Sequence, residues 1–145
     1  MKTAIVYYSK HHGNTKKLID ALAADHDITA IDASAVTTAD LSGYDLVGFA
    51  SGIYYSKFHK TVLEFAEKNL PQGKPVFFLY TYGAEKKGYT KAIAQVVAGR
   101  QAEIVGEFGC PGFNTFGPFK LIGGMAKGRP NRTDLENVRR FYAGL

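Results

Sequence analysis

Residues 2–24 read KTAIVYYSKHHGNTKKLIDALAA and contain, in order, a candidate strand, a loop and a candidate helix. Residues 2–8 are mostly apolar, β-branched or aromatic, which is typical of a buried strand. Gly13 interrupts this run, and beyond it apolar residues recur at helical spacing, at Leu18, Ile19 and Leu22. We therefore predict a strand–loop–helix unit at this end of the chain.

The same unit recurs along the chain. Further strands are predicted at 28–31, 45–51, 76–80 and 102–108, and helices at 15–24, 58–70, 88–99 and 132–142. The segment 37–41 is long enough for one helical turn. Because the runs at 2–8, 45–51 and 76–80 are continuously apolar, their strands are expected to be buried on both faces. This alternation predicts the α/β class, with an open, doubly wound parallel sheet that has helices on both faces. Residues 1–145 are expected to form a single domain.

The composition is that of an ordinary globular domain. Of its 145 residues 46% are hydrophobic, and no apolar run approaches the roughly 20 residues of a membrane span. Eighteen Lys and Arg against 13 Asp and Glu give a net charge of +5, but the basic residues are scattered and form no nucleic-acid motif. Cys110 has no second cysteine with which to pair. We expect a soluble cytoplasmic protein with no nucleic-acid partner, no stable membrane insertion and no metal site.

In such a sheet, ligands bind at the carboxyl ends of the strands, so the loops that follow strands are the candidate site. The first loop is Ser9-Lys10-His11-His12-Gly13-Asn14-Thr15. Hydroxyl groups, a glycine and free N–H groups at a helix N-terminus form a cradle for an anion. The loop matches neither the Walker A pattern nor G-x-G-x-x-G, and a monophosphate suits it better than a pyrophosphate. The alternative is a plain turn in which Asn14 or Thr15 caps the helix.

Two further loops carry aromatic residues and glycines after buried strands. They contain Ser51-Gly52-Ile53-Tyr54-Tyr55 and Thr81-Tyr82-Gly83, the latter followed by Gly88-Tyr89. Tyrosines beside a ligand crevice stack on planar rings, although one of them could instead cover the sheet edge. A phosphate at the first loop and a planar ring between the other two describe flavin mononucleotide (FMN).

At these residues the sequence resembles the flavodoxin family over essentially the whole chain. The resemblance is carried by Ile5-Val6-Tyr7-Tyr8-Ser9, Gly13-Asn14-Thr15, Tyr44–Phe49, Ser51-Gly52-Ile53-Tyr54, Pro118–Gly124 and Gly128-Arg129-Pro130-Asn131. It implies a flavodoxin-like, five-stranded parallel sheet in the order 2-1-3-4-5, noncovalent FMN, and electron transfer between redox partner proteins. By position, Ser9, His12, Asn14 and Thr15 match the phosphate loop. Ser51, Gly52, Ile53 and Tyr54 match the inner ring loop, and Tyr82, Gly83 and Tyr89 match the outer one. No residue is assigned a catalytic role.

Three departures from the family pattern leave alternatives open. The spacing Ser-x-x-x-Gly-x-Thr is one residue longer than usual and is similar to that of flavodoxin-domain proteins related to menaquinone-dependent protoporphyrinogen oxidases. The chain has no tryptophan to stack on a ring, and its net charge is +5, whereas many flavodoxins are acidic. The alternative function is therefore an FMN-dependent oxidoreductase acting on a quinone or porphyrinogen-type substrate. A binding or signalling module without a cofactor is a third hypothesis. The apolar residues Phe113, Phe116, Phe119, Leu121, Ile122 and Met125 are expected to form either a partner or quinone surface or a cover over the sheet edge.

Overall fold

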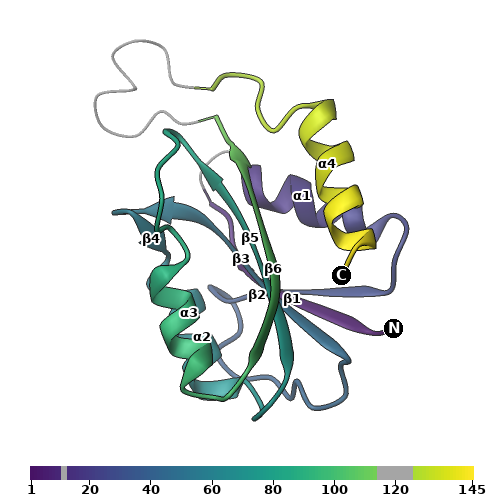
Figure 1. Cartoon of the computed structure of the whole chain (residues 1–145), viewed down its shortest axis with the longest axis vertical. Helices are drawn as coiled ribbons and strands as arrows, with labels where there is room; N and C mark the ends of the chain where they lie inside the picture. Colours follow the sequence, from purple (N-terminus) through teal and green to yellow (C-terminus); the bar gives the residue numbers. More distant parts are fainter. Residues whose placement is uncertain (11–12, 114–125) are drawn as a thin grey trace.

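The computed structural model describes residues 1–10, 13–113 and 126–145 of the protein. A central sheet contains parallel strands in the spatial order β2-β1-β3-β5-β6. Their bounds are β1 Thr3–Tyr8, β2 Ile28–Asp32, β3 Leu46–Tyr54, β5 Pro75–Tyr82 and β6 Glu103–Pro111. The parallel strands, numbered along the chain, therefore follow the predicted order 2-1-3-4-5, and Figure 1 shows them fanning across the molecule.

A sixth strand, β4 (Lys57–Phe58), corrects the prediction of a five-stranded sheet. It runs antiparallel to the end of β3, with Tyr54 opposite Lys57. The connecting residues Tyr55 and Ser56 have φ values of 51° and 67°. Such two-residue turns match the twist of a hairpin, but they usually contain Asn and Gly. The sequence therefore carries no turn signal here, and the helix predicted from 58 begins only after β4.

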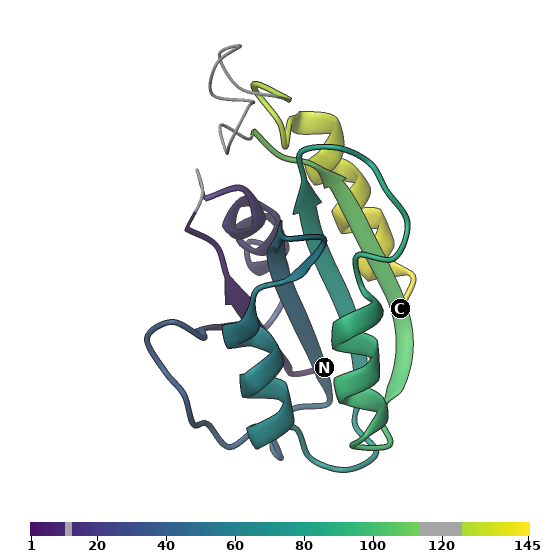
Figure 2. The same ribbon diagram turned by 90° about the vertical axis from the view of Figure 1, so that its left-hand side faces the viewer.

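The predicted helices on both faces of the sheet are confirmed. α1 (Asn14–Ala23) and α4 (Arg132–Ala143) cover one face, whereas α2 (Lys60–Asn69) and α3 (Lys91–Ala98) cover the other. Figure 2 shows α2 and α3 side by side in front of the sheet. α3 begins later than predicted because Gly88 has a φ of 90°, outside the helical region. Residues 37–41 form no helical turn. Among the described helices, none is long and apolar enough to cross a membrane.

Each face of the sheet has its own apolar core. Val6, Phe49 and Phe78 pack under α2 and α3, and Ile5, Phe77 and Leu79 pack under α1 and α4. Neighbouring residues of β1, β3 and β5 point to opposite faces, so these continuously apolar strands supply both cores. The burial of both faces that the sequence predicts is therefore confirmed, and it leaves the loops at the strand ends as the place for a ligand.

The start of α4 is anchored by charged and polar side chains. The Asn131 side chain accepts a hydrogen bond from the Asp134 backbone N–H, and the Asp134 carboxylate accepts one from the Asn131 backbone, which confirms the predicted capping box. Arg129 donates two hydrogen bonds to Asp134, at 2.6 and 2.7 Å. Burial alone would raise the pKa of Asp134, but these hydrogen bonds outweigh it and lower the pKa. The Arg129 side chain is thereby held against the first turn of α4.

Candidate functional site

The carboxyl ends of the central strands meet at one edge of the sheet. The register places Tyr8 beside Ser51, Gly52 beside Thr81, and Tyr82 beside Pro111. The loops that follow β1, β3 and β5 therefore start next to one another. The structure brings the described members of the predicted site together at this edge, while His11 and His12 lie outside the described residues.

The first loop ends in an open turn at the start of α1. Gly13 is the residue that precedes the helix, with φ 64° and ψ 24°, and it makes no side-chain cap. The Ser9 hydroxyl instead accepts a hydrogen bond from the backbone N–H of Lys16 at 3.0 Å. The alternative in which Asn14 or Thr15 caps α1 is wrong, because both lie inside the helix and are buried. Lys10 is exposed, and its ammonium lies 3.8 Å from the carboxylate of Asp32.

Asn14 and Thr15 connect the first loop to the ends of the neighbouring strands. The Asn14 amide donates to the carbonyl of Phe113 at 2.7 Å, and the hydroxyls of Thr15 and Thr81 are hydrogen-bonded at 3.0 Å. Asn14 is only 5% exposed, and its side-chain oxygen has no hydrogen-bond partner among the described residues. A buried acceptor of this kind is unusual and is available to a ligand that donates a hydrogen bond.

Gly112 packs closely against Asn14 and Thr81, although the sequence-based site prediction does not include it. A Cβ on Gly112 would lie 2.8 Å from the Asn14 amide nitrogen and 3.0 Å from Cβ of Thr81. Its backbone N–H donates to the Tyr82 carbonyl at 2.9 Å, which extends the pairing of β5 with β6 one residue beyond the end of β6. No local pattern marks this glycine, because the constraint comes from side chains distant in the sequence.

We expect Gly112→Ala to lower the free energy of unfolding by about 1–3 kcal/mol, because the new methyl group displaces Asn14 or separates the strand ends. Urea denaturation followed by circular dichroism measures the change. Gly43→Ala is the matched control, since a Cβ on Gly43 meets nothing within 4 Å and its φ is not positive. Equal stability of the two variants would contradict the close packing at Gly112.

The second loop builds an aromatic group on one side of the edge. The rings of Tyr8 and His59 stack at 3.7 Å with an interplanar angle of 10°, and Tyr54 lies edge-on to both. Ser51 is fully buried, and its hydroxyl accepts a hydrogen bond from the His59 backbone N–H at 3.0 Å while it donates to the Gly52 carbonyl. Gly52 and Ile53 lie between Ser51 and Tyr54 in β3. Tyr55 follows β3 and is 95% exposed at the tip of the hairpin.

His59 joins this group, although the site prediction omits it. The His59 ring caps α2 by accepting a hydrogen bond from the Thr61 backbone N–H. Burial, with a smaller contribution from the charge of Lys60, lowers the pKa of His59. The lowered pKa favours the neutral form of the ring, whose flat face packs against Tyr8. A histidine just before a helix gives no sequence signal for such stacking.

The third loop places a second aromatic group on the other side. The rings of Tyr82 and Tyr89 lie 6.0 Å apart with an interplanar angle of 29°. Tyr89 is 6% exposed, and its hydroxyl donates to the Ala84 carbonyl, so it braces the loop that contains Gly83. Burial raises the pKa of Tyr82, and the carboxylate of Glu85 adds to this effect. Tyr82 is half-buried and remains the more accessible of the two rings.

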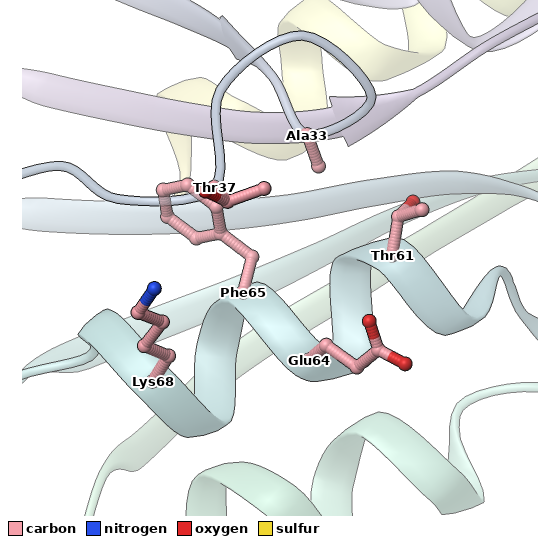
Figure 3. A pocket seen from close by; sticks show the side chains of 6 residues that line it. All are labelled: Ala33, Thr37, Thr61, Glu64, Phe65 and Lys68. Atoms are coloured by element: carbon pink, nitrogen blue, oxygen red, sulfur yellow. The ribbon is translucent and has the colours of Figure 1, made fainter.

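A separate cavity of about 220 Å³ lies between α2 and the connection from β2 to β3 (Figure 3). It is lined by Ala33, Thr37, Thr61, Glu64, Phe65 and Lys68. This is the connection in which the predicted helical turn at 37–41 does not form. None of the described candidate residues lines it, so it is not part of the strand-end site.

The strand-end site is suited to hold an anion and a flat ring, and the described residues offer no other reactive centre there. Burial raises the pKa of the Cys110 thiol to about 12, so the thiol stays protonated and unreactive at neutral pH. Within the described residues, no group of His, Cys, Asp or Glu could hold a metal ion. The chemistry available is binding by N–H groups, hydroxyls and aromatic faces.

Comparisons with known proteins agree with this geometry. A family model for the flavodoxin domain matches residues 5–110. An uncharacterized protein of Methanocaldococcus jannaschii is 36% identical over 147 residues, which cover 100% of this chain and 98% of the relative.

Solved structures show the same fold. A flavodoxin from the domain Archaea aligns with a TM-score of 0.67 at 21% identity. The alignment covers 97% of this chain and 92% of the flavodoxin chain. The Fusobacterium nucleatum flavodoxin bound to flavin mononucleotide has a TM-score of 0.65 at 14% identity, covering 99% and 96%. With strand order, helix layers and family model in agreement, the chain belongs to the flavodoxin family.

Proposed function

We propose that this chain binds FMN at the strand-end site and carries electrons between redox partner proteins in the cytoplasm. The observation that carries the proposal is the meeting of the anion-binding start of α1 with two aromatic loops at one sheet edge. Membership of the flavodoxin family and the FMN-bound relative support the choice of cofactor. The unpaired Cys110 agrees with a reducing compartment.

The residues at the start of α1 fit a phosphate group. The first backbone N–H groups of a helix have no partners within it, and the helix dipole favours an anion there. Among the described residues, nothing lies within 4 Å of a Cβ built on Gly13, so these residues leave room for a ligand at the turn. The free side-chain oxygen of Asn14 would accept a hydrogen bond from a hydroxyl group of the ribityl chain.

The aromatic loops fit the flavin ring. FMN supplies one- and two-electron redox chemistry when bound. Tyr54, held edge-on by Tyr8 and His59, would cover one ring face, and Tyr82, supported by Tyr89, would cover the other. These side chains would orient the ring and exclude water from its faces. The lysines around the site would favour negative charge on the bound cofactor.

Absorbance spectroscopy tests the proposal directly. Purified protein is mixed with FMN, and the unbound FMN is then removed. We expect the protein to keep a flavin absorbance spectrum and to release one FMN per chain when it is denatured. Reduced protein is then mixed anaerobically with menadione, a soluble quinone. Slow reoxidation is expected for an electron carrier, whereas rapid reoxidation at a rate that saturates with menadione concentration would favour the quinone-dependent oxidoreductase. Failure to retain FMN would overturn both redox functions.

A further inference from the structure

The rim of the strand-end site is strongly basic. Residues 51–60 and 82–91 contain five lysines and one carboxylate, that of Glu85. All five lysines are exposed: Lys57, Lys60, Lys86, Lys87 and Lys91. We call these residues, together with Tyr55, the lysine surface. The chain's net charge of +5 is thus concentrated where the second and third loops meet.

The fold does not require these lysines. Ion pairs among the described residues use Lys10, Lys16, Arg129, Arg132 and Arg139 as cations, and none of the five rim lysines takes part. Lys60 and Lys91 are the first residues of α2 and α3, and neither helix has an acidic residue in its first turn. Cations at a helix N-terminus oppose the helix dipole, so stability favours acidic residues there. The basic charge is therefore explained better by recognition than by folding.

Tyr55 gives the lysine surface an exposed aromatic centre. It is 95% exposed and stands at the tip of the β3–β4 hairpin with a φ of 51°. Asn or Gly would suit this left-handed position better than a tyrosine. An exposed tyrosine kept in a costly conformation is typical of an interface, where such rings contribute much of the binding energy.

The two parts of the lysine surface are neighbours in space. β4, which carries Lys57, packs beside α3, which begins at Lys91. Figure 1 shows the loop between β5 and α3 descending past β4. Lys86 and Lys87 lie in that loop, next to Tyr82 and Tyr89. The surface therefore borders the place where the flavin ring is proposed to sit, on the side of the second and third loops.

We propose that the lysine surface docks an acidic face of a redox partner protein, with Tyr55 at the centre of the contact. This inference rests on the proposed function, because it names the partner class for that same site. Complementary charge raises the rate of association and orients the partners, and its effect falls as salt screens it. A partner with a basic face would be repelled.

The test uses two forms of one electron acceptor. Native cytochrome c is basic, whereas succinylation of its lysines makes it acidic. Reduced, FMN-loaded protein is mixed with each form in a stopped-flow instrument at an ionic strength of about 10 mM, where the Debye length is about 30 Å. We expect the succinylated form to react at least about tenfold faster, with the advantage disappearing in high salt. Faster reaction with the native form, or rates independent of salt, would overturn the proposal.

Matched variants assign the effect to the surface. K86E/K87E and K57E/K60E each lower the net charge from +5 to +1, because two Lys→Glu changes remove four charges. K68E/R140E makes the same change away from the rim. We expect the rim variants to lose most of the preference and the control to keep it. Tyr55→Asn suits the turn better and should slow the reaction without unfolding the hairpin. Equal losses in rim and control variants would mean that net charge alone acts.

An NMR titration separates failure of docking from failure of the proposed function. The oxidised, succinylated cytochrome is added to the isotope-labelled protein, with FMN content measured by absorbance. Shift changes centred on Tyr55 and the rim lysines support docking even if no flavin is retained. Changes elsewhere, or none, would overturn docking even if FMN binds and is reduced normally.

Discussion

Phe77→Ala should lower the free energy of unfolding by about 3–5 kcal/mol, because it removes a fully buried ring from the centre of the sheet. Phe77 lies on β5 in the core under α1 and α4, with its ring centroid 5.8 Å from that of Tyr142 and 6.3 Å from that of Phe141. Its loss would therefore weaken the packing of α4 against the sheet. Urea denaturation measured by circular dichroism gives the change, and a loss below about 1.5 kcal/mol would contradict it.

Gly48 provides a second variant that tests the same packing. Gly48 and Phe77 are partners in the register of β3 and β5, and a Cβ on Gly48 would lie 2.4 Å from the tip of the Phe77 ring. Gly48→Ala alone should destabilise by about 1–3 kcal/mol. In a Phe77→Ala background the same change should cost little, because the ring that it would meet is gone. If the losses of unfolding free energy from the two changes simply add in the double variant, the Phe77 ring does not pack over Gly48.

Gly48 also illustrates why much of the fold could be predicted from the sequence and why some of it could not. The runs around Ile5, Phe49 and Phe78 are apolar on both faces, and this local property is enough to predict a covered parallel sheet. The choice of glycine at 48 depends on Phe77, a residue on another strand. Similarly, β4 depends on a turn at Tyr55 and Ser56 whose residue types do not favour it.

The candidate site likewise contains features that the sequence could predict and features that it could not. The sequence could place the residues that follow strands at one edge of the sheet, because topology alone brings the carboxyl ends of parallel strands together. The sequence could not distinguish Tyr54, packed against Tyr8 and His59, from Tyr55, which is exposed. It also could not identify Gly112, whose contact with Asn14 joins distant segments. Side-chain direction and long-range contacts are settled only in the folded chain.

Gly13→Asp should weaken FMN binding by about 100-fold relative to Gly13→Asn, because it places a carboxylate in the proposed phosphate loop. At an effective dielectric constant of about 20, two unit charges about 5 Å apart repel by about 3 kcal/mol. Gly13 has a φ of 64°, and both Asn and Asp tolerate this left-handed conformation better than other side chains do. A Cβ at this position meets none of the described residues within 4 Å, so neither variant should clash with them.

The two variants differ by one charge at nearly constant size, so their comparison isolates electrostatics from backbone strain. Fluorescence titration with FMN measures the difference, and riboflavin, which lacks the phosphate, is the control ligand. If the phosphate lies at the start of α1, riboflavin should bind the two variants almost equally while FMN distinguishes them. Equal FMN affinities would place the phosphate elsewhere. If Gly13→Asp weakens riboflavin binding as much as FMN binding, the carboxylate acts at the ring site rather than at the phosphate. The ligand would then have to bind the three loops in a different orientation.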